Sequence, residues 1–200
     1  MRRIATIGVY GFSVGAFLEE LTDAGVGLLL DLRQRRGVRG PDYSWANSAR
    51  LQLALAEACV GYRHVKELAP TTELRQLQYR DDDRHGVSKR NRTMLAPEYV
   101  ERYTREILDP LDVASVVAEL PGDSVTALLC VEREPEACHR SLVAARLRSE
   151  YGLPVVDLRP EGGPGSPADV SGALTNGLSP VAVVAVTRRP RAVSSCEQQR

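Results

Sequence analysis

The chain carries no excess charge, since its 26 lysine and arginine residues are matched by 26 aspartate and glutamate residues. This balance argues against unspecific binding to polyanions by a generally basic surface. No stretch approaches the roughly 20 apolar residues that would span a bilayer, so we expect no membrane partner. The apolar run at 4–7 is too short for a secretion signal, and we therefore expect a soluble, cytoplasmic protein.

Cysteine and lysine are both scarce. The cysteines Cys59, Cys130, Cys138 and Cys196 are too few for a disulfide scaffold, and we expect them to be core residues unless their spacing gives them a role. Arginines outnumber lysines 24 to 2. Arginine favours planar, bidentate contacts with carboxylate or phosphate. The composition by itself leaves the activity open.

Short apolar runs alternate with helical patterns along residues 1–160. Runs typical of strands lie at 4–9, 26–32, 62–68, 125–131 and 155–158, and helical spacing appears at 13–25, 48–58, 97–107, 112–120 and 135–150. Because hairpin signals are absent, this alternation predicts a single compact α/β domain with a mainly parallel sheet flanked by helices. The polar segment 69–95 is expected to be a surface insertion or lid with some helix.

Beyond Pro160 the composition changes to glycine, proline, serine, alanine and valine. Such a composition is typical of disorder, so we expect residues 161–200 to form a flexible tail. A β-prone run at 181–186 could pair with an edge of the sheet, but it is too short to make a second domain.

Binding sites of open parallel sheets form in the loops beyond the carboxyl ends of the strands. The first strand ends in a turn that contains Gly8, Tyr10 and Gly11, directly before a helix start. Such a turn can bring backbone N–H groups close to an anion. The alternative is a tight turn that needs its glycines for purely structural reasons.

The second strand ends in Asp31 and Arg33, which point to the same side of an extended chain. They could form a plain ion pair, or Asp31 could orient Arg33 as a clamp on a ligand. The loop that follows could contact nucleic acid through phosphates and stacked bases, or its arginines could simply be solvated. The candidate residues of this loop are Arg35, Arg36, Arg39, Tyr43 and Trp45.

The fourth apolar run is the most informative, because Cys130 and Glu132 lie at its end and Cys138 and His139 open the next helix. The two thiols and His139 could bind a metal, although no fourth ligand is visible. The thiols could instead form a redox or sulfur-transfer pair, or be core residues beside a polar set in which Glu132 or His139 moves a proton. We favour packed thiols beside a working polar set, and we predict no metal and no cofactor.

Several of these elements occur together in the order found in one known family. They are Thr6-Ile7-Gly8, Asp31-Leu32-Arg33, Tyr62-x-His64 with Leu68, and above all Cys130-x-Glu132 followed by Pro135-x-x-Cys138-His139-Arg140-Ser141-Leu142. Over residues 1–160 the chain resembles the family called domain of unknown function 488. The resemblance implies a compact α/β domain with a polar pocket, involved in nucleotide or nucleic-acid processing.

The first motif departs from the pattern of that family, which is Thr-Ile-Gly-His-Ser. Here Val9 and Tyr10 stand in place of the His and the Ser. If that His is catalytic in relatives, this chain has either lost the chemistry or recruited Tyr10, His64 or His139 for it. His64, at the third strand, is otherwise a satisfied surface histidine.

Our leading hypothesis is an enzyme that binds a phosphorylated, nucleotide-derived ligand over the carboxyl ends of the strands. In it Arg33 and Arg140 clamp the anion, while Glu132, His139 and His64 handle protons. Replacing either arginine with alanine should then abolish binding and leave folding intact.

Two rivals remain open. One is a cysteine-dependent redox or sulfur-transfer enzyme that uses Cys130 and Cys138. The other is a non-catalytic module that holds nucleic acid or a protein through the loop at 35–45, with binding that weakens in salt.

Overall fold

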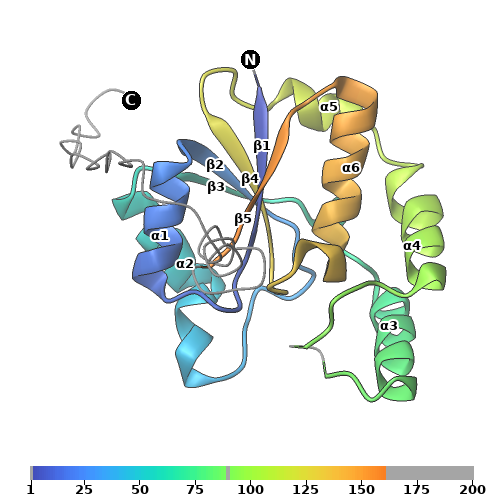
Figure 1. Cartoon of the computed structure of the whole chain (residues 1–200). Helices are drawn as coiled ribbons and strands as arrows, with labels where there is room; N and C mark the ends of the chain where they lie inside the picture. Colours follow the sequence, from blue (N-terminus) through green and yellow to red (C-terminus); the bar gives the residue numbers. More distant parts are fainter. Residues whose placement is uncertain (1, 89–90, 161–200) are drawn as a thin grey trace, which may run out of the picture. The chain divides into compact units, whose positions relative to one another are not determined.

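Five short parallel strands form a single sheet (Figure 1). The computed structural model describes residues 2–88 and 91–160. Within them β1 (Arg3–Gly8), β2 (Val26–Asp31), β3 (Gly61–His64), β4 (Val125–Cys130) and β5 (Val155–Leu158) have the order β3-β2-β4-β1-β5. The predicted α/β architecture with a parallel sheet is confirmed. The predicted tail at 161–200, with its β-prone run, lies outside the described residues.

Helices cover both faces of the sheet, because the inner strands are apolar on both sides. Helices α1 (Val14–Asp23) and α2 (Ser48–Glu57) pack on one face, against Ala5, Leu29 and Ala127. The other face, with Ile4, Leu30 and Leu128, is covered by α3 (Thr72–Arg84), α4 (Pro97–Tyr103), α5 (Val113–Ala118) and α6 (His139–Tyr151). All of β4 is buried, as expected for a central strand between two helical layers.

Short 3₁₀ and π turns connect several of these elements. They are η1 (Pro41–Ala46), η2 (Lys66–Leu68), η3 (Thr104–Leu108) and η4 (Pro135–Ala137). The third strand ends at His64, not at 68, since η2 occupies its predicted end. The predicted helix at 135–150 also starts later, because Cys138 has an extended backbone (φ −142°, ψ 142°) that separates η4 from α6. Cys138 is therefore the residue before the helix and not part of its first turn.

The segment 69–95 is not mainly a surface insertion, because it contains the 13-residue helix α3. Leu74 and Leu77 of this helix are part of the core under the sheet. Its inner face also buries Gln78 and Asp82, two polar residues that interrupt the apolar pattern a helix normally shows. Among the helices of the described ranges, none combines the length and apolarity needed to cross a membrane.

Candidate functional site

A pocket of about 430 Å³ lies at the carboxyl ends of β2 and β4. Its walls come from the loop after β2, from α3, and from the segment between α3 and α4. Its floor is formed by the end of β4 and the start of α6, where Cys130, Glu132, Cys138 and His139 meet. The structure thus brings together the four residues of the most informative sequence motif.

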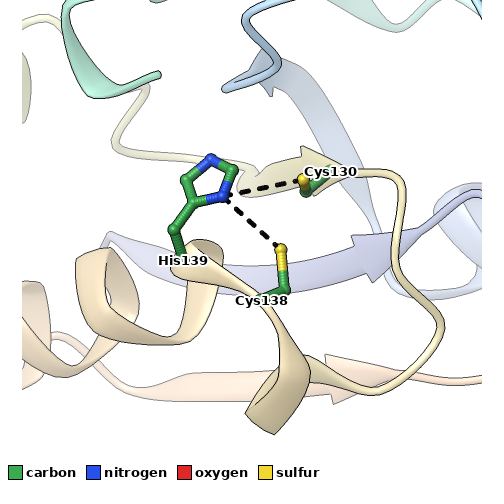
Figure 2. A group of neighbouring side chains, drawn as sticks. All are labelled: Cys130, Cys138 and His139. Carbon is green, nitrogen blue, oxygen red and sulfur yellow. Dashed lines mark hydrogen bonds between the residues drawn. The ribbon is translucent and has the colours of Figure 1, made fainter. Parts of the chain in front are cut away.

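The two thiols converge on one nitrogen of His139 (Figure 2). The Sγ atoms of Cys130 and Cys138 each lie 3.8 Å from Nδ1 of His139. The other nitrogen, Nε2, donates a hydrogen bond to the carbonyl oxygen of Leu32 at 3.1 Å. Because a carbonyl only accepts, Nε2 carries a hydrogen, so in the neutral form of the ring the Nδ1 lone pair faces the sulfurs.

The surroundings of Cys130 favour the protonated form of its thiol. Burial raises its pKa well above the ordinary value, and the neighbouring Cys138 and Glu132 raise it further. The thiol can therefore donate to Glu132 Oε2, which lies 3.2 Å from Cys130 Sγ. For His139, burial lowers the pKa, but the proximity of Cys130 and Glu132 outweighs this and leaves it raised. A buried, protonated thiol is a poor nucleophile; the redox and sulfur-transfer rival stays a prediction.

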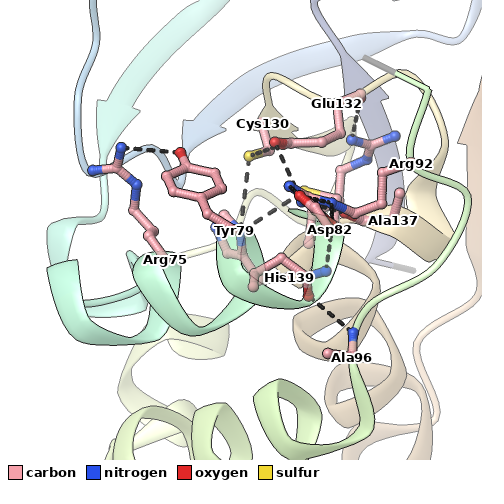
Figure 3. A network of polar contacts seen from close by, with 12 residues as sticks. Arg75, Tyr79, Asp82, Arg92, Ala96, Cys130, Glu132, Ala137 and His139 are labelled. Carbon is pink, nitrogen blue, oxygen red and sulfur yellow. Dashed lines mark hydrogen bonds and ion pairs between the residues drawn. The ribbon is translucent and has the colours of Figure 1, made fainter. Parts of the chain in front are cut away.

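An ion pair that sequence reasoning missed borders the pocket (Figure 3). Arg92 Nε and Nη2 contact Asp82 Oδ1 and Oδ2 at 2.9 and 2.5 Å, and both side chains are buried. Arg92 Nη1 also donates to the carbonyl of Ala137 at 3.4 Å and lies 3.9 Å from Glu132 Oε1. The pair therefore ties α3 to the loop that carries the cysteines. The run of aspartates at 81–83 among arginines was its only signal.

Each guanidinium nitrogen of Arg33 is bonded to the protein, although the residue is part of the pocket lining. Its Nε and Nη2 contact Asp31 Oδ1 and Oδ2 at 2.8 and 2.6 Å, and its Nη1 donates to the carbonyl of Ala46 at 2.8 Å. Burial opposes its charge, but the bonds to Asp31 leave the pKa of Arg33 raised. The structure thus supports the plain ion pair and not a ligand clamp.

Arg140 and Gly8 support the loop after β4 and do not line the pocket. Arg140 is fully buried and donates to the carbonyls of Glu132 and Arg133 at 2.6 and 2.8 Å. A Cβ at Gly8 would lie 2.0 Å from the Glu132 carbonyl oxygen. We therefore expect Arg33→Ala and Arg140→Ala to destabilise the fold instead of leaving it intact, since each would orphan buried polar groups.

The turn after β1 uses its backbone N–H groups within the protein. Those of Val9 and Tyr10 donate to the carbonyl of Val131 at 3.2 and 3.0 Å, and that of Gly11 donates to the hydroxyl of Tyr43 at 3.3 Å. We expected this turn to present its N–H groups to an anion, but these three N–H groups are bonded within the protein. Only the side chain of Tyr10 reaches the pocket.

The loop predicted to contact nucleic acid is divided in the structure. Arg35 and Arg39 are exposed and line the pocket, whereas Arg36 donates to the hydroxyl of Tyr62 at 3.5 Å. Tyr43 packs edge-on against Tyr10, and Trp45 packs against Phe17 on the α1 side of the sheet. Trp45 is thus part of the packing and not a stacking platform for bases.

His64 lies outside the pocket lining. Its Nε2 shares a 2.9 Å hydrogen bond with the carbonyl of Arg33, so the ring supports the loop after β2. The structure thus favours the alternative in which His64 is hydrogen-bonded within the protein, and it does not support a role for His64 as a base.

Comparison with known proteins gives one match. The model of a family described as Domain of unknown function DUF488 matches residues 13–147. No curated protein and no solved structure matches the chain. The matched stretch is more than half of the chain, and it includes the cysteine, histidine and glutamate residues of the pocket floor. The chain therefore belongs to the DUF488 family.

Proposed function

We propose that this chain is an enzyme that binds a small phosphorylated ligand, such as a nucleotide, in the pocket and acts on it with the groups of the pocket floor. One observation carries the proposal: among the residues that the structure describes, the lining contains five arginines and a single carboxylate, that of Glu132. The arginines are Arg33, Arg35, Arg39, Arg75 and Arg92.

The positive charge available to a ligand comes from three of these arginines. The charges of Arg33 and Arg92 are balanced by buried aspartates. Arg35, Arg39 and Arg75 form no ion pair with a carboxylate in the described ranges 2–88 and 91–160, and Arg75 contacts the neutral side chains of Gln34 and Tyr79. Guanidinium groups without carboxylate partners at a pocket mouth favour phosphate.

The size and the walls of the pocket suit a nucleotide. Its volume of about 430 Å³ falls in the range of small-molecule sites. The half-buried rings of Tyr10 and Tyr79 are part of the lining, and aromatic faces beside arginines stack with planar bases. The ligand would place its phosphate near the arginines and its base against a tyrosine.

Glu132 is the side chain best placed to exchange a proton with a ligand. It is the one carboxylate of the lining, it is buried, and its main chain is held by Arg140. His139 is less suited to this role than expected, because its Nε2 is bound to Leu32 and its Nδ1 faces the thiols. General acid–base catalysis by Glu132 is therefore the chemistry we propose.

Calorimetric titration with ADP and with pyrophosphate at low ionic strength tests the binding step. The double variant Arg35→Ser/Arg39→Ser should weaken binding at least about tenfold, because charge-assisted hydrogen bonds contribute roughly 1.5–3 kcal/mol each. Arg50→Ser is the matched control, since Arg50 is exposed on α2 and outside the lining. If neither probe binds, or if both variants behave alike, the proposal fails.

Turnover separates an enzyme from a binding module. A nucleotide panel incubated with the protein and analysed by mass spectrometry should yield a product, and Glu132→Gln should abolish it while the affinity for ADP changes little. Binding that is unaffected by Glu132→Gln with no product from any nucleotide would favour the binding module.

A further inference from the structure

We infer that Cys130, Cys138 and His139 form a transition-metal site, with zinc as the preferred ion and one coordination position open to the pocket. Sequence alone favoured packed thiols without a metal, since only three ligands are visible in it. The inference goes beyond the proposed function and does not depend on which ligand the pocket takes.

The spacing of the three ligand atoms is compatible with a tetrahedral site. Zinc binds thiolate sulfur at about 2.3 Å and imidazole nitrogen at about 2.0–2.1 Å, so tetrahedral angles place the ligand atoms roughly 3.5–3.8 Å apart. Both Sγ–Nδ1 distances are 3.8 Å, and all three atoms lie within 4.8 Å of one another. An ion can therefore enter with little movement of the side chains.

The orientation of His139 is that of a metal ligand. Its Nε2–H is bound to the Leu32 carbonyl, which leaves the Nδ1 lone pair directed at the point between the sulfurs. Metal-binding histidines nearly always donate their second N–H to a carbonyl or a carboxylate in this way, which fixes tautomer and ring orientation.

The end of β4 and the start of α6 supply the three ligands. Cys130 is the last residue of β4, Cys138 is the residue before α6, and His139 is the first residue of that helix. Arg140 fixes the loop between them through the carbonyls of Glu132 and Arg133. The extended backbone of Cys138 delays the start of α6 and places a second sulfur beside Nδ1 of His139.

All three ligands are buried and line the floor of the pocket. Three protein ligands and an open side are typical of catalytic rather than structural zinc sites, with water in the fourth position. Two thiolates neutralise the charge of the ion, and its binding releases their two protons. Glu132 lies 3.2 Å from Cys130 Sγ, so its carboxylate would be positioned to hold a proton beside an ion bound there, and such an ion would lower the pKa of a water in its open position.

Metal analysis of the full chain tests the inference. The parent for the test carries Cys59→Ser and Cys196→Ser, so that Cys130 and Cys138 are its only thiols. After anaerobic purification without chelator and dialysis against Zn²⁺, we expect one ion per chain by elemental mass spectrometry. Cys138→Ser and His139→Ala should each weaken Zn²⁺ binding at least about 100-fold, with circular dichroism reporting whether the fold persists.

Cobalt substitution keeps the inference testable if these variants unfold. The Co²⁺ form of the parent should show thiolate-to-cobalt charge transfer and the strong visible bands of tetrahedral coordination. A parent that holds no Zn²⁺ and gives only the weak spectrum of octahedral Co²⁺ would overturn the inference, as would a folded Cys138→Ser variant that binds Zn²⁺ equally well. A Cys130–Cys138 disulfide that forms equally fast with Zn²⁺ present would show a redox pair instead.

The metal site and the proposed function can fail separately. Arg35→Ser/Arg39→Ser should keep its Zn²⁺ while losing affinity for ADP. Cys138→Ser should lose Zn²⁺ whether or not ADP binds.

Discussion

Replacing Arg33 with leucine should destabilise the whole domain, although the residue borders the pocket. Arg33 is 2% exposed, and its guanidinium forms two contacts with Asp31 and one with the carbonyl of Ala46. Leucine would leave the Asp31 carboxylate buried without its cationic partner. Only the hydroxyl of Tyr62 at 2.7 Å and the main-chain N–H at 3.1 Å would still bind it.

The expected loss is set by the orphaned charge. Removing one partner of a buried ion pair costs about 3–5 kcal/mol, so with a urea m-value of about 2 kcal/mol/M the midpoint should fall by roughly 1.5–2.5 M. Urea unfolding followed by circular dichroism measures this shift. Arg35→Leu is the control, because Arg35 is exposed two residues away, and its effect should stay within about 0.5 kcal/mol.

A double variant tests whether the charge is the cause. Asp31→Asn/Arg33→Leu removes the orphaned carboxylate charge but keeps an acceptor for Tyr62. Its loss of stability should be smaller than the sum of the two single losses by about 0.5–3 kcal/mol. An Arg33→Leu protein that unfolds at the same urea concentration as the parent would refute the assignment of Arg33 as a structural residue and restore it as a candidate ligand clamp.

Three further perturbations have expected outcomes. Gly8→Ala should lower the unfolding midpoint in urea strongly, because its Cβ would meet the carbonyl of Glu132 at 2.0 Å, whereas Gly15→Ala, with no atom within 4 Å, should be neutral or slightly stabilising. Ser13→Ala should cost about 0.5–2 kcal/mol in the same assay, since the Ser13 hydroxyl caps α1 by accepting from Ala16 N; an unchanged midpoint would contradict the cap. Removing Zn²⁺ from the loaded protein with a chelator should lower the melting temperature, and adding Zn²⁺ should restore it; a melting temperature indifferent to both would contradict a bound ion.

The sheet and most helices could be predicted because their patterns are local. The strands around Leu29 and Leu128 are continuous apolar runs, which buried parallel strands require. The pattern of α3 was missed because its inner face carries Gln78 and Asp82, which are satisfied by the N–H of Ala96 and by Arg92. Polar residues on a buried helix face cannot be told from surface residues before their partners are known.

The membership of the pocket floor was predictable, but the roles of the arginines were not. Sequence spacing put Asp31 and Arg33 on one side of the chain and left the ion pair and the ligand clamp open. The choice between these two interpretations depends on the carbonyl of Ala46, 13 residues away, which accepts a hydrogen bond from the remaining guanidinium nitrogen of Arg33. Arg140 was predicted to bind a ligand for the same reason. Its acceptors are the main-chain carbonyls of Glu132 and Arg133, and the sequence does not show that these carbonyls face Arg140.

Whether the floor of the pocket is a working site is tested most directly by X-ray diffraction at the zinc absorption edge, on crystals of protein purified anaerobically without chelator. The structure predicts one anomalous peak about 2.3 Å from the sulfurs of Cys130 and Cys138 and about 2.0–2.1 Å from Nδ1 of His139. Well-ordered thiols with no peak between them after soaking in Zn²⁺, or a disulfide in their place, would contradict it.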